Sequence, residues 1–160
     1  MPVDLLTQLP FFKDLAAEQQ QWLEPYFIPC EYEADTIIFN QGEQADYLYI
    51  ILEGEVVVSF KPDDGPALIV ARVLSGSVVG WSAALRSRLY TSTALTAVDT
   101  QMLRVRGSDL RAIYEQDAKL GQKLLDWLAS QIAERLRSTH SQVLALLQLG
   151  LGRTIQTQEV

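Results

Sequence analysis

Residues 80–94 of the chain, with the sequence GWSAALRSRLYTSTA, contain the side-chain types that could hold a small ligand. A glycine turn, a tryptophan, two arginines and a run of hydroxyls follow one another within a short span. Backbone N–H groups at the start of a short helix, with hydroxyls and an arginine, are donors that suit a small anion. The same residues could equally form a short helix and loop that bind nothing. The candidate ligand-binding residues are Gly80, Trp81, Ser82, Arg88, Tyr90, Thr91 and Ser92.

Two residue types in this segment have more than one interpretation. Trp81 can fill space between a sheet and a helix, or it can serve as a lid over a flat ligand. Arg86 and Arg88 are either solvated charges or clamps on an anion. The alternating hydroxyls near Thr91 matter only if their strand lines a pocket.

Catalytic and metal-binding chemistry is poorly supported elsewhere in the chain. It has one cysteine, Cys30, and one histidine, His140, too few for a zinc site or an iron–sulfur cluster. We interpret Cys30 as a small buried side chain and His140 as a residue on a solvated helix face. A cupin-type enzyme on a similar roll would need a cluster of histidines and glutamates, and no nucleophile elbow or Walker loop is present. We therefore expect no enzyme activity, no metal and no cofactor.

Composition and charge limit the partners of the protein. The chain has 160 residues, 48% of them hydrophobic, and a net charge of −7, which disfavours binding to nucleic acid. No apolar run reaches the roughly 18 residues of a membrane span, and the N-terminus lacks the features of a signal peptide. These properties predict a cytoplasmic protein of one domain, with no nucleic acid and no membrane as partner.

The residue patterns on either side of residues 80–94 predict the helices and strands that must position this segment. Residues 1–27 predict short N-terminal helices, and residues 28–106 predict many short strands separated by glycines and by the turn KPDDGP. Residues 108–148 predict helices, the second of them long, and residues 149–160 predict a flexible tail. Residues 1–148 then form one domain that is mainly β with flanking helices, a jelly-roll-like β-roll followed by a long C-terminal helix.

The long helix carries apolar residues near a heptad spacing, which predicts a dimer interface. An apolar stripe of this length would otherwise lie open to water. Part of it could instead pack on the β-roll of the same chain. The predicted interface residues are Leu125, Leu128, Ile132, Leu136, Val143 and Leu146.

Residues 37–60 contain the block QGEQADYLYIILEGEV between two apolar stretches. Gly42 and Gly54 are expected at turns, and the strand between them should direct Leu48 and Ile50 to one face and Tyr49 and Ile51 to the other. This block resembles the cyclic-nucleotide-binding domain family, in particular the sensor half of catabolite-activator and FNR-type regulators. The resemblance spans about residues 8–148 and implies a β-roll followed by a helix that pairs two copies.

The resemblance assigns residues 80–94 to the family's phosphate-binding cassette. There, a Gly-Glu pair contacts the ribose, and an arginine followed by a small or hydroxyl residue contacts the cyclic phosphate. In this chain Gly80 is followed by Trp81, and the arginine position falls on Tyr90 or Thr91, with Arg88 as the nearest cation. Both side chains that recognise the nucleotide are therefore replaced, so we expect weak or absent binding of cyclic AMP.

The sequence thus predicts a non-catalytic regulatory or sensor module. It would bind a small ligand other than cyclic AMP, or it would have lost ligand binding. Two alternatives stay open: genuine cyclic AMP binding through a variant cassette, and a protein-interaction module with a vestigial pocket. Only about a dozen residues follow Gln148, so we expect no helix-turn-helix domain and a stand-alone sensor.

Overall fold

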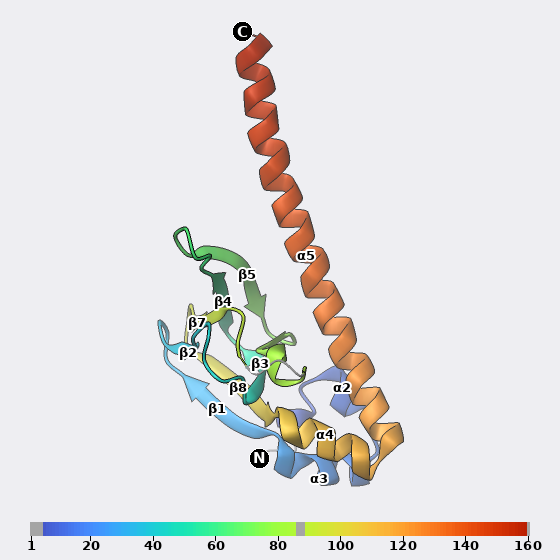
Figure 1. Ribbon diagram of the computed structural model, residues 1–160. Coiled ribbons are helices and arrows are strands. Elements are labelled where there is room, and N and C mark those ends of the chain that lie inside the picture. Colours follow the sequence, from blue (N-terminus) through green and yellow to red (C-terminus); the bar gives the residue numbers. More distant parts are fainter. Residues whose placement is uncertain (1–4, 86–88, 160) are drawn as a thin grey trace.

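The computed structural model describes residues 5–85 and 89–159, without the side chains of residues 138, 139, 142, 146 and 152–159. Helices come first along the chain, then a β-roll, then two helices, as predicted (Figure 1). The N-terminal part holds α2 (Pro10–Lys13), α3 (Ala17–Leu23) and the 3-10 turn η1 (Glu24–Tyr26). The C-terminal part holds α4 (Gly107–Gln116) and α5 (Ala118–Glu159).

In the part of the chain that the structure describes, eight strands form two four-stranded antiparallel sheets, which together make the β-roll. One sheet has the order β1-β8-β3-β6 and the other the order β2-β7-β4-β5. The strands are β1 (Ile28–Tyr32), β2 (Ile37–Phe39), β3 (Tyr47–Glu53), β4 (Glu55–Phe60), β5 (Leu68–Leu74), β6 (Val78–Val79), β7 (Thr93–Thr96) and β8 (Thr100–Arg106). The predicted fold class is therefore confirmed.

Strand β3 separates two hydrophobic cores, because its side chains alternate between the two faces of its sheet. Leu48 and Ile50 pack against the helices, in the core that also contains Leu128 of α5. Tyr49 and Ile51 face the interior of the roll, together with side chains of the second sheet. The alternation expected from the sequence is confirmed.

Two glycines that flank β3 have left-handed backbone angles: Gly42 lies in the connection from β2, and Gly54 directly follows β3. Gly42 has a φ of 90° and Gly54 a φ of 124°, in the region that L side chains rarely adopt. Gly54 also faces Thr100 so closely that a Cβ atom would lie 2.8 Å from the Cα atom of Thr100. Both glycines lie at turns, as predicted, and Gly54 is required by packing as well.

Helix α5 differs from the prediction at its C-terminal end. It begins at Ala118 and runs on to Glu159, where we expected a flexible tail from residue 149. The glycines near its end do not interrupt it, because a glycine inside a helix costs only about 1 kcal/mol relative to alanine. Figure 1 shows its C-terminal half extending well away from the roll. Within the described residues, no helix combines the length and apolar character needed to cross a bilayer.

The residues predicted for the dimer interface on α5 differ in exposure: some are buried within the chain and others are open to solvent. Leu128 is 4% exposed and belongs to the core of its own chain, so its assignment to an intermolecular interface was wrong. Ile132 is half-buried, whereas Leu125, Leu136 and Val143 are exposed. The side chain of Leu146 lies outside the described residues. The first turns of α5 pack on the domain because their apolar residues occupy a wider arc than a heptad seam.

Candidate functional site

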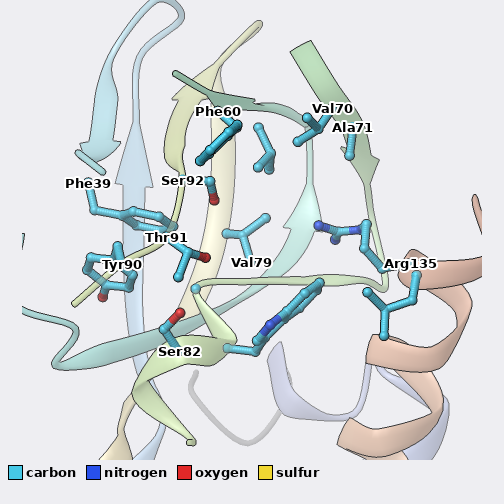
Figure 2. Close-up of a pocket in the computed structure, with 14 residues that line it drawn as sticks. Phe39, Phe60, Val70, Ala71, Val79, Ser82, Tyr90, Thr91, Ser92 and Arg135 are labelled. Carbon is cyan, nitrogen blue, oxygen red and sulfur yellow. The ribbon is translucent and has the colours of Figure 1, made fainter. Parts of the chain in front are cut away.

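A pocket of about 300 Å³ opens between the β-roll and α5 (Figure 2). Both sheets, η2 (Trp81–Ala83), the segment before β7 and α5 all contribute to its wall. Its volume is at the lower end of those seen for small-molecule sites. The lining residues are Phe39, Val58, Phe60, Val70, Ala71, Val79, Gly80, Trp81, Ser82, Tyr90, Thr91, Ser92, Arg135 and Leu136.

The turn and short helix expected after the sixth strand are present. Gly80 has a φ of 79°, and a Cβ atom there would approach the carbonyl oxygen of Tyr47 to 3.0 Å. This glycine therefore lets the chain turn tightly against β3 and enter η2. Ser82, in η2, is 6% exposed and lines the pocket.

Six of the seven candidate residues come together at this pocket. Thr91 and Ser92 line it from the segment that leads into β7, alongside Gly80, Trp81, Ser82 and Tyr90. Arg88 lies outside the described residues, as does Arg86. Residues 80–94, which the sequence analysis singled out, therefore do lie at a pocket. The role of each residue depends on its contacts.

Tyr90 is held by contacts within the protein. Its ring stacks on Phe39 with 3.8 Å between centroids, and its hydroxyl donates to the Tyr47 carbonyl oxygen at 2.6 Å. The same hydroxyl oxygen accepts a hydrogen bond from the Tyr47 N–H at 3.2 Å. Burial raises the pKa of Tyr90 to about 12, so the group stays protonated at neutral pH. Tyr90 therefore acts as a brace between the segment before β7 and the start of β3.

Removal of this hydroxyl tests the brace. Tyr90→Phe keeps the stacked ring but leaves both polar groups of the Tyr47 backbone without their partner. We expect a loss of about 1–3 kcal/mol in the free energy of unfolding, measured by urea denaturation. Tyr114→Phe is the control, because Tyr114 is 41% exposed, and it should change stability by less than about 0.5 kcal/mol. Equal effects of the two variants would contradict the bracing role.

Trp81 lines the pocket and also packs against the helical core. The guanidinium of Arg135, from α5, lies over its ring at 5.2 Å from the centroid. This arrangement joins both interpretations from the sequence, because the indole fills space between roll and helix and also forms part of the pocket wall. Its contact with Arg135 is a cation–π interaction.

Arg135 is the functional candidate that sequence reasoning missed. Its Nη2 atom donates to the carbonyl oxygen of Val78 and to Ser77 Oγ, the latter at 3.4 Å. Burial lowers its pKa to about 10, which still leaves it positively charged at neutral pH. The only hint in the sequence was its position beside Leu136, since nothing local shows that α5 closes the pocket.

Cys30 and His140, the residues outside the pocket with the most reactive side chains, show no sign of a catalytic or metal-binding role among the described residues. Burial raises the pKa of the Cys30 thiol to about 11, so this thiol is a poor nucleophile at neutral pH. His140 lies exposed on α5. Among the described residues, no three side chains of the metal-binding types come together.

The pocket lies in a β-roll, behind a glycine turn and a short helix, and a long helix closes it. This arrangement is that of a class of ligand-binding sensor domains. Residues 29–117, more than half of the chain, match the model of the cyclic nucleotide-binding domain, and the chain belongs to that family. It is 27% identical over 150 residues to the cAMP-activated global transcriptional regulator CRP of Haemophilus influenzae, covering 89% of this chain and 64% of the regulator. The chain spans 29% to 64% of the length of the first curated relatives it matches.

Solved structures show the same fold. A cyclic nucleotide-binding domain from Methylobacillus flagellatus superposes with a TM-score of 0.78 at 22% identity, covering 90% of this chain and 81% of that one. The regulatory subunit of a cAMP-independent protein kinase A from Trypanosoma brucei has a TM-score of 0.64 at 25% identity, covering 81% of this chain and 46% of that one.

Proposed function

We propose that this chain is a non-catalytic sensor module whose pocket binds a small ligand other than cyclic AMP. The observation that carries this proposal is that the Tyr90 hydroxyl is already hydrogen-bonded to the protein backbone. Tyr90 stands at or next to the position where the family's arginine contacts the cyclic phosphate. Its hydroxyl bonds to the N–H and the carbonyl oxygen of Tyr47. A neutral phenol committed to a brace cannot supply the charge that an arginine gives to a phosphate.

The rest of the pocket supports the same conclusion. Trp81 replaces the carboxylate that would accept a hydrogen bond from the ribose, and its wide apolar ring lies in the wall. Among the lining residues that the structure describes, Arg135 is the only charged one. Family membership leaves the ligand open, because one relative is described as cAMP-activated and another as cAMP-independent.

We further propose that the module forms a homodimer through α5 and acts in the cytoplasm. Leu125, Leu136, Val143 and Leu147 are 40–59% exposed and lie within a narrow arc of the helix, given its 3.6-residue period. A second copy of the helix would cover this stripe. Because α5 also supplies Arg135 and Leu136 to the pocket, ligand occupancy and helix pairing would act on the same element.

Titration with cyclic nucleotides tests the ligand proposal. Isothermal titration of the ligand-free protein with cyclic AMP and with cyclic GMP should give no binding in the low micromolar range. The physical reason is the missing charge-assisted contact to the phosphate, which is worth about one to two decades in affinity. A dissociation constant in the low micromolar range or below would contradict the proposal and would show that another residue binds the phosphate.

A further inference from the structure

Arg135 brings to the pocket a positive charge that no carboxylate of the described residues compensates. Both of its hydrogen bonds use Nη2, and their acceptors, a carbonyl oxygen and a hydroxyl, are neutral. The ion pairs found in the described part of the chain are Arg72 with Glu55 and Arg137 with Glu134, so neither includes Arg135. A guanidinium has five N–H donors, and the bonds to described residues leave several of them for a further acceptor.

Most of the remaining wall is apolar, and the hydroxyls of Ser82, Thr91 and Ser92 are its other polar side-chain groups, besides the Tyr90 hydroxyl that is bonded to the Tyr47 backbone. Its apolar lining includes the aromatic rings of Phe39, Phe60, Trp81 and Tyr90 and the aliphatic side chains of Val58, Val70 and Val79. Figure 2 shows Arg135 reaching from α5 into the space between these side chains. The pocket therefore presents a largely apolar surface, with one cationic group, Arg135, at the side closed by α5.

We propose that the pocket binds a small amphipathic carboxylate, with its apolar body against the β-roll and its carboxylate group on Arg135. This inference rests on the proposed sensor function and names the class of its ligand. A carboxylate supplies the negative charge that the half-buried guanidinium lacks, and guanidinium groups pair with carboxylates in well-defined geometry. The apolar body gains from removal of its surface from water.

Other ligand classes fit the wall less well. A cyclic nucleotide would bury a ribose and a phosphate in a wall made mostly of apolar side chains, where the described lining residues supply three hydroxyls, those of Ser82, Thr91 and Ser92, and the guanidinium of Arg135, but no carboxylate for the ribose. A purely apolar molecule would fill the pocket and leave the charge of Arg135 desolvated without a partner, which is unfavourable. A molecule with one anionic end satisfies both parts of the surface.

Matched pairs of probes test the inference. Phenylacetate and octanoate would be titrated against their uncharged amides, phenylacetamide and octanamide, with binding followed by isothermal titration. On the parent protein each carboxylate should bind about 10- to 100-fold more tightly than its amide, the range expected for one charge-assisted contact. Arg135→Gln should abolish this preference, and Arg135→Lys should retain part of it.

Arg137→Gln is the control variant. Arg137 lies two positions along α5, its side chain is 75% exposed, and it pairs with Glu134 away from the pocket. It should keep the full preference for carboxylates. Thermal unfolding verifies that each variant is folded, and if Arg135→Gln does not fold, the contrast between carboxylate and amide on the parent protein decides.

The outcomes distinguish a failure of this inference alone from a failure of the proposed function. Equal binding of amides and carboxylates to the parent protein would overturn the inference, while a pocket that takes small molecules would still support a sensor. If no probe binds, native mass spectrometry of the protein as isolated decides. A co-purified carboxylate of another shape supports the inference, and a neutral or phosphate compound overturns it alone. An empty pocket overturns both the inference and the sensor function.

Discussion

Val143→Asp is expected to convert the protein from a dimer to a monomer at micromolar concentration. Val143 is 50% exposed on α5, in the stripe that also contains Leu125, Leu136 and Leu147. In a symmetric pair of helices the substitution places two carboxylates in one apolar interface, where each is desolvated and repels the other. We expect the dimer dissociation constant to rise at least about 100-fold, or about 2.7 kcal/mol.

Sedimentation equilibrium measures this change directly. The parent protein should sediment at twice the chain mass of 17.9 kDa, and the variant at the chain mass itself. Leu149→Asp is the matched control, because Leu149 is 54% exposed but lies about 120° from Val143 around the helix, outside the stripe. The α5 interface would be refuted if the parent sediments as a monomer, or if both substitutions change its mass equally.

Gly54→Ala is expected to remove much of the stability of the β-roll. The alanine would be strained at a φ of 124°, and its Cβ atom would lie 2.8 Å from the backbone of Thr100. Thr100 cannot move aside at low cost, because it is 2% exposed and its hydroxyl donates to the carbonyl oxygen of Val98 at 2.8 Å. Backbone strain and overpacking each cost about 1–3 kcal/mol, so we expect a total loss of about 4 kcal/mol.

Gly42→Ala separates the two contributions to this loss. Gly42 also has a left-handed backbone, with a φ of 90°, but a Cβ atom there would meet nothing within 4 Å. Its substitution should cost about 1 kcal/mol, from strain alone. Urea denaturation of both variants measures the difference, and equal losses would show that the contact with Thr100 is unimportant.

Local patterns in the sequence were sufficient to predict the architecture. Alternating apolar residues such as Leu48 and Tyr49 define strand faces, and glycines such as Gly42 and Gly54 define turns, because both depend on the backbone of a few neighbouring residues. The replacement of a carboxylate by Trp81 and of an arginine at or beside Tyr90 was also visible in the sequence. The expectation of a changed ligand followed from these positions.

The contacts that assign a role to each residue depend on elements far apart in the chain. The sequence could not show that Leu128 packs into its own core, since a seam residue and a core residue have the same spacing on a helix. It also could not show that the Tyr90 hydroxyl bonds to the backbone of Tyr47, or that Arg135 reaches the pocket from α5. The sequence alone therefore determined the family and the strands, and it raised the expectation of a changed phosphate contact, because these depend on local residue types. Only the tertiary structure decided which side chains meet at the pocket, because packing between distant segments sets those distances.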